Sequence, residues 1–214
     1  MIDPDNVTNY TLTRRGLEEQ ILFWLLVAGK NAGTTARALA AVLAEARHVT
    51  STSPAASPFA VLRAYAATRK GLRPLLKRHG VGCHGLKARG IAGLLAANLD
   101  LKHCPREALL AVPGVGPKTA NCFLLHTRPD QAHLVGLDTH MLAELRERRR
   151  PDWPPVPATT PPPGATYAYW SARARELAVE AGLPMPAFDL AVFRRRRVRA
   201  GRPRSSKPKK VSAS

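Results

Sequence analysis

The sequence predicts an all-α fold. Apolar residues recur at helical spacing along most of the chain, several segments are rich in alanine, and strand-like alternation of polar and apolar residues is almost absent. The chain has 214 residues, of which 45% are hydrophobic. This is enough to bury a core in one domain or in two small lobes.

Helical patterns begin after Thr11 and continue almost to the end of the chain. We expect the stretch 59–80 to be interrupted at Pro74, and 105–112 to begin with a proline suited to a first helical turn. Residues 151–163 contain seven prolines and form a semi-rigid connector. Helices are expected at 12–29, 34–48, 59–80, 85–99, 105–112, 117–126, 139–150 and 165–182, with a short apolar element at 184–193.

This pattern divides the chain into three parts. Residues 1–10 are expected to form a flexible lead-in, because they lack helical periodicity. Residues 11–199 form the globular domain. Residues 200–214 are predicted to be a disordered basic tail.

The charge balance indicates a polyanionic partner. The chain has 33 Lys and Arg against 15 Asp and Glu, a net charge of +18, and ten of the positive charges lie between Arg194 and Lys210. Removing those ten still leaves the rest of the chain at +8. Basic side chains that neutralise phosphates release condensed counterions, so DNA is the expected partner. The tail itself suits either direct DNA contact or a solubilising or localising arm.

Other composition signals indicate a cytoplasmic protein. Three cysteines at wide spacing suit a reducing compartment, are too few for a four-thiolate iron–sulfur cluster, and are interpreted as structural. The apolar run that begins at Ile21 is too short to span a bilayer and follows two glutamates, so it is neither a signal peptide nor an anchor. We expect a monomer with no metal and no cofactor.

The most informative motif is LLAVPGVGPKTANCFLLH, residues 109–126, followed by LDTH at 137–140. Gly114 and Gly116 allow a tight turn that can approach another surface closely. A helix begins near Pro117, and the free amides at its start can bind a phosphate. The motif is therefore typical of a DNA-binding turn.

These two motifs together resemble the helix-hairpin-helix DNA glycosylase superfamily represented by endonuclease III. The resemblance extends from Leu17 to about Phe193 and implies a two-lobed all-α fold without an iron–sulfur cluster. It implies that the lysine matching Lys118 is the amine nucleophile and that the aspartate matching Asp138 is essential. The family's hairpin grips DNA, and the predicted DNA-binding residues here are Pro113, Gly114, Val115, Gly116, Lys118, Thr119, Asn31 and Lys87.

The residues themselves permit both roles. A desolvated lysine beside other cations loses its proton more easily and attacks an electrophilic carbon, while a carboxylate accepts protons or stabilises positive charge. Each also has a plainer interpretation. Lys118 could be a phosphate-binding cation, and Asp138 could cap the helix that LDTH opens.

One segment departs from the glycosylase pattern. Where glycosylases of this family carry a polar wedge, this chain reads AGKNA, which introduces Lys30. With LEEQILF, GLDTH and AFDLAVF, this turn resembles the bacteriophage α-glutamyl/putrescinyl-thymine pyrophosphorylases, or amino acid:DNA transferases. That branch implies displacement of pyrophosphate from activated 5-hydroxymethyluracil in DNA by an amine or amino acid. Lys30 is then a candidate nucleophile or pyrophosphate-binding cation, although a lysine in such a turn is most often simply exposed.

Three functions therefore stay open at this stage. The preferred hypothesis is thymine hypermodification in DNA, with Lys30, Asp138 and Lys118 as the catalytic residues and a free amine or amino acid as co-substrate. The alternatives are a base-excision DNA glycosylase and a non-catalytic DNA-binding module. Both enzyme reactions require a base that is flipped out of the stack. The aromatic residues Tyr167, Tyr169 and Trp170 could line a base pocket by stacking, but their helical spacing favours the core.

Overall fold

The computed structural model describes residues 1–28 and 30–201, with side chains placed as far as Arg197. No strand occurs in these ranges, and the predicted all-α class is confirmed. The helices are α1 (Arg14–Val27), α2 (Ala32–Thr50), α3 (Pro58–Ala66), α4 (Leu72–Arg78), α5 (His84–Ala97), α6 (Arg106–Leu110), α7 (Pro117–Thr127), α8 (Thr139–Glu147), α9 (Ala165–Glu180) and α10 (Met185–Gly201), with a 3₁₀ turn, η1, at Pro129–Gln131.

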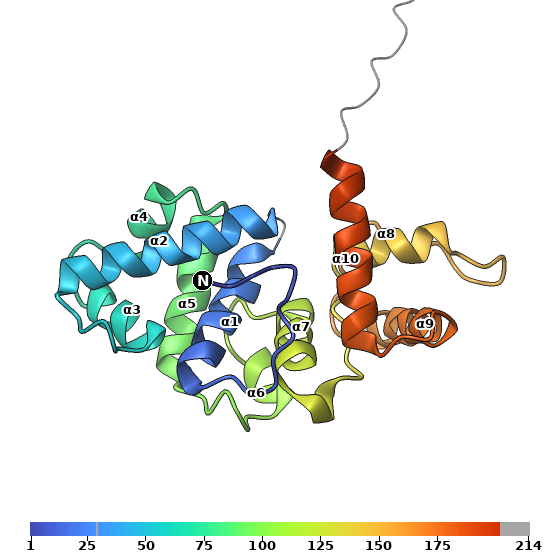
Figure 1. Cartoon of the computed structure of the whole chain (residues 1–214), viewed down its shortest axis with the longest axis horizontal. Coiled ribbons are helices and arrows are strands. Elements are labelled where there is room, and N and C mark those ends of the chain that lie inside the picture. Colours follow the sequence, from blue (N-terminus) through green and yellow to red (C-terminus); the bar gives the residue numbers. More distant parts are fainter. Residues whose placement is uncertain (29, 202–214) are drawn as a thin grey trace, which may run out of the picture.

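The helices form two lobes (Figure 1). Helices α1 to α7 make up the first lobe, and α8 to α10 lie together on the other side of α7. Each lobe buries its own apolar cluster, the first built from residues between Val7 and Leu124 and the second from residues between Leu125 and Val192. The two-lobed all-α architecture implied by the resemblance is thus the one observed.

Helix α1 is the central element of the first lobe. Its side chains from Gln20 to Val27 are all buried, as expected for a helix that is apolar around most of its circumference. Thr13 caps its start by accepting a hydrogen bond from the Gly16 amide. Glu18 is also buried, and its carboxylate is satisfied there by a hydrogen bond of 2.9 Å from the Phe59 amide at the start of α3.

The break in the stretch 59–80 covers residues 67–71, between α3 and α4, and does not include Pro74. Gly71 has φ +69° and precedes α4. Pro74 lies within the first turn of α4, where a backbone N–H would have no partner inside the helix and proline is tolerated. The predicted interruption was therefore correct in kind but was placed at least three residues too late.

The arginine run begins inside a helix. Helix α10 continues through Arg194–Arg197, where we predicted only a short apolar element ending at Phe193. Arg195 and Arg196 pair with Glu144 of α8, and Arg197 pairs with Asp5 at 2.8 Å. Part of the basic run thus packs the second lobe and the start of the chain. The predicted disordered tail, 200–214, lies almost wholly outside the described residues.

Residues 1–10 also contact the domain. Val7 is buried, its carbonyl accepts a hydrogen bond from Gln20, and the Asn9 amide donates to the carbonyl of His126. The Thr8 hydroxyl binds the His126 ring at 2.7 Å. The sequence predicted a loose lead-in and did not predict these contacts, which bring the segment to the edge of the cavity between the lobes.

Candidate active site

The hairpin between α6 and α7 packs against two glycines of α5. Gly114 has φ +87°, and a Cβ on it would lie 3.2 Å from the Cα of Gly90. A Cβ on Gly93 would lie 3.0 Å from Val112 and 3.2 Å from Pro113. The hairpin therefore requires glycine on both sides of this contact, and its turn is held rigidly on α5.

The segment before α8 is held by three polar side chains. Asn121 of α7 and Tyr167 of α9 both donate to the Val135 carbonyl, at 2.8 and 2.9 Å. Thr160 of the proline-rich connector donates to the Leu137 carbonyl at 2.7 Å. These bonds tie the segment to both lobes and to the connector. They fix the position of Asp138, the next residue.

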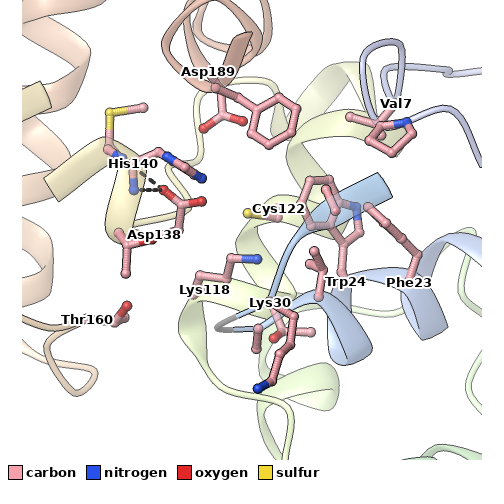
Figure 2. A pocket seen from close by; sticks show the side chains of 18 of the residues that line it. Val7, Phe23, Trp24, Lys30, Lys118, Cys122, Asp138, His140, Thr160 and Asp189 are labelled. Carbon is pink, nitrogen blue, oxygen red and sulfur yellow. Dashed lines mark hydrogen bonds between the residues drawn. The ribbon is translucent and has the colours of Figure 1, made fainter. Parts of the chain in front are cut away.

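A cavity of about 650 Å³ opens between the lobes. Figure 2 shows it from close by, with side chains from α1, α7, α8 and α10 and from the N-terminal segment around it. Its polar and charged lining residues are Lys30, Asn31, Lys118, Thr119, Asp138, Thr139, His140, Thr160, Asp189 and Arg197. The structure therefore brings all three predicted catalytic residues to the wall of one cavity.

Lys118 extends from the first turn of α7 into this cavity. Its Nζ lies 4.8 Å from the centre of the Trp24 indole, a cation–π distance. The Trp24 indole also stacks on the imidazole of His126, at 5.4 Å with the rings only 12° from parallel. An amine held over an aromatic face, with no carboxylate of the described residues within ion-pair distance, is presented toward the cavity.

Asp138 both caps α8 and faces the cavity. Its Oδ1 accepts hydrogen bonds from the amides of His140 and Met141, at 2.9 and 2.8 Å. Burial raises the pKa of Asp138 above its ordinary value of 3.8, and the charge of Asp189 raises it further, while the charge of Lys118 opposes both. The capping and catalytic interpretations are thus compatible, since one carboxylate oxygen makes the cap and the other remains available.

Lys30 lies at the edge of the cavity and points away from the other two residues (Figure 2). Its side chain lies directly over Gly82, in the space that a Cβ on that residue would fill. There it also lines a second, smaller cavity of about 230 Å³. The structure thus places Lys118 and Asp138 on the same part of the cavity wall and sets Lys30 apart from them.

Lys87 is buried, with only 4% of its surface exposed. Its ammonium donates to the carbonyl of Leu26 near the end of α1. Burial lowers the pKa of Lys87, and the positive charges of Lys30 and Lys118 lower it further, against the opposing charge of Cys83. Lys87 therefore supports the junction of α1 and α5, and it is not among the residues through which we propose DNA contact.

The remaining predicted DNA-binding residues differ in accessibility. Pro113 and Gly114 are exposed at the tip of the hairpin, whereas Val115 and Thr119 are buried beneath it. Asn31 caps α2 by accepting a hydrogen bond of 3.0 Å from the Thr34 amide. A direct contact with DNA is thus open to the tip of the hairpin and to the start of α7.

Two functional candidates were missed by the sequence reasoning. Asp189 of α10 lines the cavity, and its Oδ2 accepts a hydrogen bond of 3.2 Å from Nε2 of His126. His126 is fully buried. The sequence motif AFDLAVF, residues 187–193, contains this aspartate, but only the packing of α10 against α7 reveals its partner.

The aromatic residues of α9 belong to the core, as their spacing favoured. Tyr167 and Trp170 are buried, and Trp170 packs edge-to-face on Trp153 at 5.9 Å. The aromatic side chains at the cavity come from elsewhere, namely Phe23, Trp24 and Phe193. Burial raises the pKa of the Cys122 thiol beside them, which disfavours its nucleophilic thiolate form.

Residues 106–126 match the family described as the helix-hairpin-helix motif. The match covers α6, the hairpin and α7 as far as His126, the part of the chain from which Lys118 projects. It supports the helix-hairpin-helix superfamily and DNA as a partner. No curated protein and no solved structure matches the chain. Among the described residues, no helix has both the length and the hydropathy needed to cross a membrane.

Proposed function

We propose that this chain binds duplex DNA through its hairpin and chemically modifies a base that is flipped out into the cavity. The observation that carries this proposal is the meeting of Lys118 and Asp138 in one cavity directly behind the hairpin. A base must leave the stack before an enzyme can reach it. A pure binding module has no need of a carboxylate that is kept partly buried at such a place.

The reaction that we propose is thymine hypermodification. An amine or amino acid would displace pyrophosphate from activated 5-hydroxymethyluracil in DNA, as in the phage transferases that the AGKNA turn resembles. A cavity of about 650 Å³ supports this choice, since cavities of roughly 300–1,000 Å³ hold ligands of drug size and a single base is smaller. Room remains for a co-substrate beside the base.

Within this reaction the two lysines have different parts. Lys118 lies beside Asp138 over the Trp24 ring, where it can contact the flipped nucleotide. Lys30 lies at the edge of the cavity beyond Lys118 and suits a pyrophosphate-binding cation better than a nucleophile. Asp138 is the carboxylate that accepts protons or stabilises positive charge during the displacement.

Base excision is the second candidate function, favoured by the presence of Lys118 and Asp138 in one cavity and by the separation of Lys30 from them. In that reaction the Lys118 amine would attack the sugar carbon of the flipped nucleotide, and Asp138 would assist. Lys30 would then have no catalytic part and would serve at most as a contact to DNA.

Mass spectrometry of nucleosides and free bases separates these functions. Duplex DNA carrying pyrophosphorylated 5-hydroxymethyluracil, supplied with amino acids and putrescine, and duplex DNA carrying oxidised or deaminated bases would each be incubated with the protein. A heavier nucleoside together with released pyrophosphate is the expected result. A free base and an abasic site would identify a glycosylase, and unchanged DNA in both arms would leave only the binding module.

A further inference from the structure

Asp189 presents an unused carboxylate oxygen at the cavity. Its side chain is 15% exposed, and its Oδ2 is bound to Nε2 of His126. Among the described residues, Oδ1 has no hydrogen-bond partner. Helix α10 thus places one fixed, accessible anionic acceptor in the wall of the proposed reaction chamber.

The orientation of Asp189 is set by a chain of buried groups. The Thr8 hydroxyl lies 2.7 Å from Nδ1 of His126 and can donate to it, which leaves the proton on Nε2 for Asp189. The imidazole is also clamped by its stacking on Trp24. A carboxylate held in this way pays little conformational entropy when it binds a ligand.

The charges of the cavity are distributed unevenly around Lys118. In Figure 2 the Lys118 amine lies between Asp189 on one side and Lys30 on the other, with Asp138 to the side. A displacement at carbon needs the incoming group and the leaving group on opposite sides of that carbon. Arg197 of α10 also lines the cavity, but its charge is paired with Asp5. The cationic end at Lys30 suits the departing pyrophosphate, so the carboxylate end is the side from which an ammonium group would enter.

We propose that Asp189, held by His126, is the binding site for the primary ammonium group of the co-substrate, an assignment that rests on the proposed transferase function. The Asp189 carboxylate binds R–NH₃⁺, and the Asp138 carboxylate takes one proton from it. The freed amine forms a C–N bond to the activated methylene carbon as the C–O bond to pyrophosphate breaks and pyrophosphate leaves with the electron pair. The product retains the remaining two protons on a secondary ammonium, and Asp138 returns the proton that it accepted to solvent.

The variant that tests this assignment is Asp189→Asn. The amide keeps the size of the side chain and can still accept from His126, but it has no charge with which to bind an ammonium group. Asp152→Asn is the matched control, because Asp152 is exposed on the proline-rich connector and does not line the cavity. Donor KM and kcat would be measured for both variants with glycine and with putrescine.

We expect the donor KM of Asp189→Asn to rise by about tenfold or more, the loss of one charge-assisted contact, with kcat largely recovered at saturating donor. Recovery at high donor concentration also establishes that the variant is folded. An unchanged donor KM, or a KM that rises equally in Asp152→Asn, overturns the assignment. Whichever of glycine and putrescine has the larger kcat/KM with the wild type indicates whether the natural donor is an amino acid or a diamine.

A binding measurement keeps this inference separate from the proposed reaction. The protein would be bound to a duplex with a tetrahydrofuran nucleotide, which leaves the base space empty, and titrated by calorimetry with glycine and with putrescine. Binding by the wild type and weakening by about tenfold in Asp189→Asn support the site even if no product ever forms, in which case only the proposed function fails. Absence of amine binding by the wild type overturns the site.

Discussion

Asp138 and Glu144 lie six residues apart at the start and in the middle of α8, and their surroundings are opposite. Glu144 is completely buried, yet it is paired with Arg148 at 2.7 Å, with Arg196 at 3.0 Å and with Arg195. Burial by itself would raise the pKa of Glu144, but hydrogen bonds from Arg195 and Arg196 bring it below its ordinary value. Burial raises the pKa of Asp138, and no arginine of the described residues is paired with it.

The difference separates a structural carboxylate from a reactive one. Three guanidinium groups keep Glu144 ionised and fix α8 against α10, so its charge is fully used within the fold. Asp138 keeps a carboxylate oxygen for the cavity, where a second carboxylate, that of Asp189, also lies. Titratable groups whose pKa is shifted by burial beside a cavity are characteristic of active sites.

The largest expected effect is on turnover. Asp138→Asn should reduce it by about 10³-fold, within the range for removal of an acid–base group, because the amide still caps α8 but cannot accept a proton. Glu144→Gln should leave turnover per folded molecule unchanged. Rates would be measured by product mass spectrometry under single-turnover conditions. Equal losses in the two variants would erase the distinction between the carboxylates.

The free energy of unfolding should depend more on Glu144 than on Asp138, the opposite of the order expected for turnover. Glu144→Gln leaves three arginines without their shared partner and should lower the free energy of unfolding by about 3 kcal/mol. Glu147→Gln, a change to a half-exposed carboxylate that pairs with Arg196, serves as control and should cost about 1 kcal/mol or less. Urea denaturation followed by circular dichroism measures both. A loss for Glu144→Gln no larger than that of the control would mean that the cluster does not hold α8.

The two carboxylates should also give opposite dependences of stability on pH. Because the pKa of Asp138 is raised in the fold, its ionisation destabilises the native state as pH rises above 3.8, so Asp138→Asn should gain stability relative to the wild type with rising pH. Glu144 contributes stability that is present above pH 4.5 and is lost as pH falls through its lower folded pKa. Unfolding curves of the wild type, Asp138→Asn and Glu144→Gln between pH 3 and pH 7 would give the free energy of unfolding that each carboxylate contributes at each pH. If the two contributions changed with pH in the same direction, the contrast would be refuted.

A smaller effect is expected at Lys30. Lys30→Ala should lower transferase turnover by about tenfold, the contribution of one charge-assisted contact to the leaving pyrophosphate, without changing stability. Lys102→Ala, at an exposed position that does not line the cavity, is the control. Full activity of Lys30→Ala would remove this lysine from the mechanism and favour base excision by Lys118.

The hairpin provides the most local test, because it concerns a single contact between the turn and α5. Gly114→Ala should cost about 1–3 kcal/mol, because its φ is +87° and the new Cβ would press on the backbone of Gly90. Gly116→Ala should cost well under this, since nothing lies within 4 Å of its Cβ position and its φ is −89°. Thermal unfolding of the two variants compares them directly. Similar losses would mean that the turn is not held on α5.

The sequence was sufficient for features that depend on local spacing. Helical periodicity predicted the order of the helices, and the glycine-rich turn predicted the hairpin. That Lys118 and Asp138 share a site was implied only by the family resemblance. The helices and the hairpin depend on short segments whose geometry is largely set by neighbouring residues. The misplaced break near Pro74 shows the limit even here, because a proline in the first turn of a helix is tolerated.

Features that depend on distant packing were not predictable from a single sequence. Asp189 and His126 are 63 residues apart and meet only because α10 packs on α7. Lys87 was predicted to bind DNA, yet it is buried against the end of α1. The arginine run resembled the start of a tail, but its partner Glu144 becomes visible only when α8 and α10 are placed side by side. Charge and periodicity do not reveal which polar residue finds such a partner.

The measurement that most directly tests the separation of DNA binding from chemistry is the DNA affinity of Asp138→Asn. Fluorescence anisotropy with a duplex that carries a tetrahydrofuran nucleotide would compare this variant with the wild type at one salt concentration. We predict affinities equal within about twofold, because the hairpin binds the DNA and Asp138 acts only on the flipped base. A fall in affinity that parallels the loss of turnover would contradict this, since Asp138 would then serve binding rather than reaction.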